Sequence, residues 1–297
     1  MGFMTFVTHL INGISLGSIY AIIALGYTMV YGIAKMLNFA HGDVIMVGAY
    51  VIFTVVVSLQ LPIPLGILLA IILCTLLGVI IEKIAYKPLR NATSSLAVLI
   101  TAIGVSYFLQ NIALIVFGSG AKTFTSVVDI KPIKLANEQL VISGETIVTV
   151  MCCIVIMVGL NLFIKKTKAG QAMLAVSEDK GAAILMGINV NKTIAITFAI
   201  GSALAAIAGA LLCSAYPILT PYTGAMPGIK AFTAAVFGGI GSIPGALIGG
   251  ILLGVIEIFG RAYISSQFSD SIVFMVLILV LIVKPTGILG KKIQEKV

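Results

Sequence analysis

The sequence predicts an all-α integral membrane protein with about eight or nine transmembrane helices, some of them broken or re-entrant. Only 9% of its 297 residues are charged, whereas about 25% are charged in soluble domains, and its mean hydropathy is +1.20. The apolar residues form long continuous runs rather than the alternating pattern of a membrane β-barrel. Because a lipid interior accepts only helices or closed barrels, helices are the expected spanning elements.

Most apolar runs are close to the roughly 20 residues that a helix needs to cross a bilayer. The expected spans are residues 6–31, 44–59, 64–84, 96–117, 147–164, 193–215 and 272–283, the last somewhat short. A further apolar segment at 231–259 is interrupted by glycines, so it forms either one broken span or two short elements. Together these segments are expected to build one transmembrane domain over residues 1–297.

The basic residues fall mostly in one set of loops, and this sets the expected orientation. That set holds 13 of the 18 Lys and Arg residues. They are Lys35, Lys83, Lys87, Arg90, Lys165, Lys166, Lys168, Lys180, Lys192, Lys284, Lys291, Lys292 and Lys296. Since basic loops stay in the cytoplasm, the C-terminus and the loop at 165–192 are expected inside, and the N-terminus and the loop at 118–145 outside. The net charge of +8 then reflects membrane orientation, and no nucleic-acid partner is expected.

Two stretches interrupt the helices at membrane depth or at its edge. In residues 31–50, polar side chains crowd the junction of the first two spans; residues 237–250, FGGIGSIPGALIGG, hold six glycines and one proline. Irregular backbone at this depth is tolerated only where protein covers it or where it lines a wet cavity. Interrupted segments of this kind point to the binding region of a transporter. The predicted substrate path therefore comprises Asn38, His41, Asp43, Gly238, Gly239, Gly241 and Pro244.

Other features of these stretches have a structural interpretation. The GxxxG spacing within residues 245–254 suits close helix packing, which we weigh equally against a role in the path. Glu257 and Arg261 are spaced i,i+4 and are expected to form a structural ion pair. Lys230 is expected to extend toward the outer surface, and Asp43 to complement the start of its helix.

The inner loop at 165–192 contains a short apolar cluster. We expect a surface helix that is capped by Ser177 and stopped by Gly187. An apolar helix on the inner face binds either lipid headgroups or a protein groove, and the residues alone do not distinguish these partners.

Four segments resemble the permease subunit of the bacterial high-affinity branched-chain amino-acid importers, which are ABC transporters. They are ALGYTMVYGIAKMLNFAHGDVIMVGAY (24–50), KPLRNATSSLAVLITAIGVSYFLQN (87–111), GIKAFTAAVFGGIGSIPGALIGGILLGVIE (228–257) and KPTGILG (284–290). The resemblance covers essentially the whole chain. It implies an ABC importer permease fold in the bacterial inner membrane and the transport of leucine, isoleucine and valine.

The resemblance also implies partners. These are a second homologous permease subunit, two cytoplasmic ATPases that hold ATP and Mg, and an extracytoplasmic solute-binding protein, so this chain is expected to be no enzyme and to bind no cofactor or metal. Ala182, Ala183 and Gly187 match the EAA-xxx-G coupling motif of importers and are assigned to ATPase coupling. Gly181 stands where that motif has Glu. Gln171 and Leu174 stand where many relatives have Arg.

Alternative functions stay open at this point. Permeases for urea and short amides share much of the same pattern, and the membrane partner could be a second copy or a homologue. An ion-coupled secondary transporter would need acidic or His side chains in the inner parts of its spans, and the sequence shows none there. An intramembrane enzyme built on a metal site would need a motif such as HExxH, which is also absent.

Overall fold

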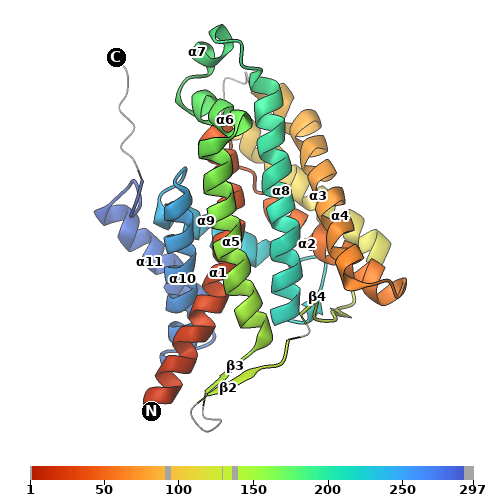
Figure 1. Cartoon of the computed structure of the whole chain (residues 1–297), viewed down its shortest axis with the longest axis vertical. Coiled ribbons are helices and arrows are strands. Elements are labelled where there is room, and N and C mark those ends of the chain that lie inside the picture. The colour runs from red at the N-terminus through yellow and green to blue at the C-terminus, as the bar shows by residue number, and fades with distance from the viewer. Residues whose placement is uncertain (1, 91–94, 129, 136–139, 291–297) are drawn as a thin grey trace. The chain divides into compact units, whose positions relative to one another are not determined.

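The structure is a computed structural model that describes residues 2–90, 95–128, 130–135 and 140–290 (Figure 1). Among these residues, seven helices are long and apolar enough to cross a membrane. They are α1 (Phe3–Ala34), α2 (His41–Phe53) with the turn that extends it to Ser58, α3 (Ile63–Ile81) with the turns that extend it to Leu89, α4 (Ser95–Phe117), α5 (Gly144–Lys166), α8 (Val190–Ala215) and α10 (Ile243–Tyr263). An eighth apolar helix, α11 (Ser269–Val283), is shorter. The prediction of an all-α membrane protein is confirmed, and these helices fit the expected number.

The remaining elements are short. Helices α6 (Lys168–Glu178) and α7 (Lys180–Leu185) follow α5, and α9 (Ala225–Gly238) precedes α10. Strand β1 (Lys122–Thr123) pairs with β4 (Ile218–Leu219), and β2 (Ile133–Leu135) pairs with β3 (Leu140–Ile142), both antiparallel. The apolar segment at 231–259 therefore forms two elements, α9 and α10, rather than one broken span.

The chain divides into two compact units, which we describe separately. Unit 1 comprises Met1–Thr28, Ile130–Met157 and Lys230–Val297, and unit 2 comprises Met29–Asp129 and Val158–Ile229. Helices α1, α5 and α9 each contribute residues to both units. The expectation of one transmembrane domain over residues 1–297 stays a prediction.

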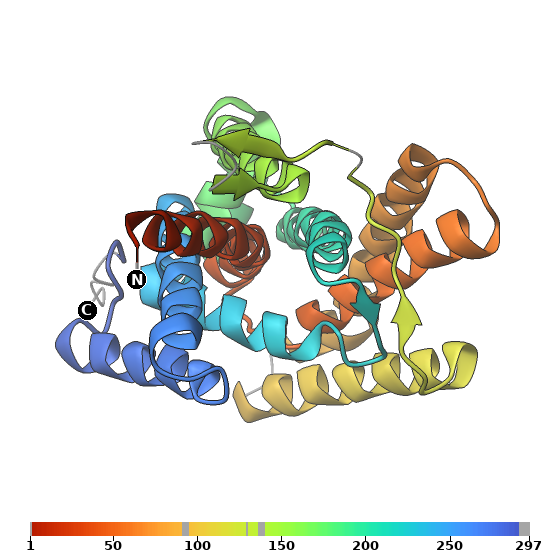
Figure 2. The same ribbon diagram turned by 90° about the horizontal axis from the view of Figure 1, so that it is seen from below.

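In unit 2, α2, α3 and α8 pack most closely against one another, and Figure 2 shows α8 nearly end-on. Small residues make the approach possible. A Cβ at Gly209 would lie 2.5 Å from the Ile45 carbonyl oxygen, and a Cβ at Gly48 would lie 2.9 Å from the Cα of Ala206. Membrane helices associate through such close backbone contacts because lipid gives no hydrophobic drive between them.

In unit 1, α10 packs its glycines against α1. A Cβ at Gly250 would lie 2.5 Å from the Ala21 nitrogen, and one at Gly254 would lie 2.2 Å from the Gly17 nitrogen. Gly249 makes the same kind of contact with α9, where a Cβ would lie 2.2 Å from the Ala234 carbonyl oxygen. Of the two interpretations of residues 245–254, close packing accounts for these three glycines.

Figure 1 shows how the two ends of unit 1 differ. The start of α1 and the β2–β3 hairpin lie at its lower end, and the turn between α9 and α10 lies at its upper end. Large apolar side chains on α5 and α11 are exposed, among them Val155 and Ile278, as expected for surfaces that face lipid.

Candidate functional site

The junction between α1 and α2 carries the first group of predicted path residues. Helix α1 ends at Ala34, and Lys35 adopts a φ of 59°, so the chain leaves the helix before α2 starts at His41. Asn38, His41 and Asp43 are 3%, 1% and 2% exposed. The structure thus brings all three together in unit 2, as buried polar groups.

Two partners that the sequence did not reveal hold this junction. The hydroxyl of Tyr86 donates to Asn38 Oδ1 at 3.0 Å, and Nε2 of Gln110 donates to Asp43 Oδ1 at 2.8 Å. Asp43 lies in the first turn of α2, but the N-cap is Ala40, which makes no side-chain cap bond. The expectation that Asp43 serves the helix start is therefore incomplete, because its carboxylate is bound by α4. The available signal was the polar pair Gln110 and Asn111 inside a largely apolar span.

A buried ion pair stabilises the far end of α3. Glu82 is 1% exposed and pairs with Arg90, which also donates to the side-chain oxygen of Asn191. Burying a carboxylate is costly unless it is paired, and Arg90 supplies that partner. The hydrogen bond from Arg90 to Asn191 then ties the extended end of α3 to the start of α8 within unit 2.

The second predicted break lies between α9 and α10. Helix α9 ends at Gly238 and α10 begins at Ile243, and Gly239 and Gly241 adopt φ angles of 107° and 91° that favour glycine. The break is confirmed, but it is narrower than the predicted stretch 238–244. Pro244 lies in the first turn of α10, where the ring fits because that N–H has no helical partner.

The backbone groups at this break are bonded to protein. The carbonyl oxygens of Phe237 and Gly238 accept from the backbone N–H groups of Ile288 and Leu289, both at 2.9 Å. Ser242 caps α10 by accepting from the Gly245 N–H at 3.2 Å. Of the two conditions that permit irregular backbone at membrane depth, protein cover is therefore the one met at Phe237 and Gly238.

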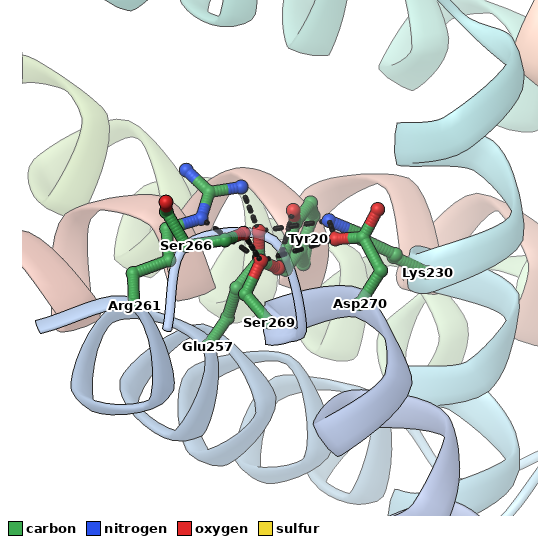
Figure 3. A network of polar contacts seen from close by, with 7 residues as sticks. All are labelled: Tyr20, Lys230, Glu257, Arg261, Ser266, Ser269 and Asp270. Atoms are coloured by element: carbon green, nitrogen blue, oxygen red, sulfur yellow. Dashed lines mark hydrogen bonds and ion pairs between the residues drawn. The ribbon is translucent and has the colours of Figure 1, made fainter. Parts of the chain in front are cut away.

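A buried charge network occupies the other end of α9, α10 and α11 (Figure 3). Glu257 is fully buried and accepts hydrogen bonds from Tyr20 and Lys230, both at 2.8 Å, while Arg261 pairs with it from one helical turn away. Lys230 also contacts Asp270 Oδ1 at 2.6 Å. The predicted pair of Glu257 and Arg261 forms, but it is part of a network of two cations and two carboxylates.

The rim of the network is partly open. The side chains of Arg261 and Asp270 are 37% and 45% exposed, whereas that of Lys230 is 5% exposed. Ser269 accepts from Arg261 Nε at 3.4 Å and donates to the Ser266 carbonyl oxygen at 3.1 Å. The expectation that Lys230 reaches the outer surface is wrong, because two carboxylates hold its ammonium inside.

The loop at 165–192 folds into two helices instead of one. Thr167 caps α6 by accepting from the Gly170 N–H, and Asp179 caps α7 by accepting from the Ala182 N–H, both at 3.0 Å. Ser177 lies within α6 and donates to the Leu174 carbonyl oxygen at 2.7 Å, so its predicted role as the cap is wrong. The extended backbone of Asp179 separates the two helices, which makes Asp179 the capping residue.

The predicted stop of this helix is confirmed. Gly187 has a φ of 80° and its N–H donates to the Ile184 carbonyl oxygen at 2.9 Å, a common way to end a helix. Ala183 is buried and Ala182 is exposed. Leu185 and Met186 are 89% and 82% exposed, so α7 presents an uncovered apolar tip.

One contact in unit 2 joins α7 to the α1–α2 junction. The ammonium of Lys180 donates to the carbonyl oxygen of Ala34, the last residue of α1, at 3.1 Å. Burial lowers the pKa of Lys180, and the charges of Arg90 and Lys35 lower it further. A cation placed on the final carbonyl of a helix also favours the negative end of the helix dipole.

Comparison with known proteins now identifies the family. Residues 9–282 match the family described as branched-chain amino acid transport system / permease component. The chain belongs to this permease family. The permease is 46% identical to the high-affinity branched-chain amino acid transport system permease protein LivH of Salmonella typhimurium, over 99% of both chains. It is 45% identical to the corresponding protein BraD of Pseudomonas aeruginosa, over 98% of both chains.

The similarity to a ribose permease and to a solved structure is lower. The permease is 30% identical to the ribose import permease protein RbsC of Haemophilus influenzae, over 84% of this chain and 76% of the other. The solved structure of PsaBC from Streptococcus pneumoniae in complex with Fab covers 96% of this chain and 91% of its own, at 15% identity and a TM-score of 0.44. This second likeness is too low to support an argument. Family membership and the apolar helices make the chain a multi-pass membrane protein.

Proposed function

We propose that the chain is the transmembrane subunit of an ATP-driven importer that moves leucine, isoleucine and valine inward across the bacterial inner membrane. The observation that carries this proposal is the 46% identity that extends over 99% of both chains. Such even coverage favours a shared transport role over a shared local motif. The basic loops support a cytoplasmic C-terminus and an outer N-terminus.

The proposed path uses both interrupted regions. The buried polar groups Asn38, His41 and Asp43 would shape one part of it within unit 2. Gly238, Gly239, Gly241 and Pro244 form the α9–α10 turn and its exit, and would shape the other part. Since the carbonyls of Phe237 and Gly238 are already bonded, the turn acts in this proposal through its shape rather than by binding solute with those carbonyls.

Energy would enter through α7. Its exposed Leu185 and Met186 suit a groove on an ATPase subunit, with Ala182, Ala183 and Gly187 as the coupling segment. In this proposal the two cytoplasmic ATPases hold ATP and Mg, a second permease subunit completes the membrane part, and an outer binding protein delivers the amino acid. This chain then carries out no chemical step and binds no cofactor.

Replacement of Gly187 by Val tests the coupling role. A β-branched residue is strained at a φ of 80°, and a Cβ there meets nothing within 4 Å, so the membrane helices should stay folded. We expect ATP hydrolysis by the assembled complex without amino-acid uptake. The matched control is Gly118→Val, which lies outside α7 and has nearly the same φ, 78°, and equally open surroundings. Uptake in the Gly187 variant equal to that control would remove α7 from the mechanism.

Substrate competition tests the proposed cargo. The assembled complex is reconstituted in proteoliposomes with its binding protein and supplied with labelled leucine and internal ATP. Isoleucine and valine should compete with leucine uptake, and urea, acetamide and ribose should not. Uptake of urea or acetamide without uptake of leucine would favour the amide-permease alternative instead.

A further inference from the structure

The segment after α11, residues 285–290, binds the end of α9 at the α9–α10 turn. Ile288 donates its N–H to the Phe237 carbonyl oxygen and Leu289 donates its N–H to the Gly238 carbonyl oxygen, both at 2.9 Å. These two carbonyls lie in the last turn of α9, where helix carbonyls have no partner in their own helix. A segment about 50 residues further along the chain therefore completes this helix end.

Glycines make this contact possible. A Cβ at Gly287 would lie 2.5 Å from the Val236 carbonyl oxygen and 2.6 Å from the Gly239 nitrogen, and Gly287 has a φ of 77°. A Cβ at Gly239 would lie 2.3 Å from the Gly290 nitrogen. Backbone thus meets backbone on both sides, with no side chain between them.

Hydrogen bonds with Lys284, the residue just before the segment, also fix its conformation. The Gly287 N–H donates to the Lys284 carbonyl oxygen at 2.9 Å, and the Lys284 ammonium donates to the Ile288 carbonyl oxygen at 2.6 Å. Because α11 ends at Val283, the segment is a short and internally bonded extension of that helix. A shift of the end of α11 would therefore move the turn.

We propose that residues 285–290 are a strap that positions the α9–α10 turn, and that this positioning is required for each ATP cycle to move an amino acid. The strap belongs to the terminal KPTGILG, residues 284–290. None of its residues is among those proposed for the solute path or for ATPase coupling. The inference rests on the proposed transport function. It assigns the strap a positioning role, because its backbone groups contact the turn.

The first test compares Gly287→Ala with Gly118→Ala in the reconstituted complex. The two glycines share nearly the same φ, 77° and 78°, but a Cβ at Gly118 meets nothing within 4 Å. Both variants thus introduce the same backbone strain, and only the first disturbs the strap. We expect the amount of leucine moved per ATP hydrolysed to fall about tenfold in Gly287→Ala and by less than about twofold in Gly118→Ala. Equal ratios in the two variants would overturn the strap.

A second pair tests the Ile288 N–H at a single position. Ile288→Ala keeps the N–H that binds Phe237, whereas Ile288→Pro removes it. We expect the leucine-to-ATP ratio of Ile288→Ala to be near that of the unmodified complex and that of Ile288→Pro to be clearly lower. If Gly287→Ala fails to assemble, this pair decides, and a ratio in Ile288→Pro equal to that in Ile288→Ala would overturn the inference.

The unmodified complex separates the two proposals. If it shows no ATP-dependent uptake of leucine, the proposed function fails. If it transports leucine and the strap variants match their controls, the strap alone fails. A merely structural role would lower the yield of the complex and both activities together, and would leave the ratio of leucine to ATP unchanged.

Discussion

The three helices α9, α10 and α11 are held at their two ends by different kinds of contact. At one end Lys230, Glu257, Arg261 and Asp270 join them through charged side chains (Figure 3). At the other end two backbone hydrogen bonds and closely spaced glycines join the α9–α10 turn to the strap. Contact at the first end requires particular charged side chains, whereas contact at the second end requires glycines that carry no side chain.

This difference predicts how each end responds to substitution. Removing one partner of a buried ion pair leaves a charge that water cannot reach, and this is strongly destabilising. At the glycine end most side-chain changes should be tolerated, except where a Cβ has no room or an N–H is lost. Substitutions at the end that holds the charge network, the charge end, should therefore destabilise the fold by leaving buried charge unpaired. Substitutions at the end that holds the turn and the strap, the glycine end, should destabilise it by steric overlap.

The largest effect is expected for Lys230→Met. The substitution leaves the fully buried Glu257 with Tyr20 and the partly exposed Arg261, so the free energy of unfolding should fall by about 3–5 kcal/mol. Thermal unfolding of the purified permease in detergent, followed by circular dichroism, measures this. The control is Lys192→Met, at an exposed position in the first turn of α8, which should change little. Equal stability of the two variants would show that the network does not hold the charge end.

A smaller effect is expected for Gly239→Ala at the other end. The new Cβ would overlap the Gly290 backbone at a φ of 107°, which should cost about 1–3 kcal/mol. The matched control is Gly159→Ala within α5, where a Cβ meets nothing within 4 Å; that change should be neutral or stabilising. The same unfolding assay applies, and an unaffected Gly239 variant would contradict the close approach of turn and strap.

The smallest effect is expected for Asp270→Asn. Its side chain is 45% exposed, and exposed ion pairs contribute about 0.2–1 kcal/mol. The variant separates the open rim of the network from its buried centre. A loss as large as that of Lys230→Met would mean that Asp270, and not Glu257, is the main partner of Lys230.

The sequence indicated most of the helices and the site of the break, because both follow from local composition. It also indicated the pair of Glu257 and Arg261, since their spacing places them one turn apart on one helix. It did not indicate Lys230 as a buried partner or the contact of Gln110 with Asp43, because these side chains meet only through packing between distant helices. The strap left even less signal, since its hydrogen bonds use backbone atoms that every residue except proline carries.

Capping shows the same limit at short range. Ser177 and Asp179 are both good capping residues, and the choice between them depends on where the chain bends after α6. The structure places that bend at Asp179. Composition likewise did not decide whether residues 245–254 serve helix packing or the solute path. The contacts of Gly250 and Gly254 with α1 favour packing, and they form only when distant helices meet in the folded chain.

The most direct test of the account is uptake of labelled leucine by proteoliposomes that contain either this chain alone or the complete complex with its ATPases and binding protein. The account predicts uptake by the complete complex only, and only when ATP is supplied. Leucine uptake by this chain alone, or uptake by the complex without ATP, would contradict it.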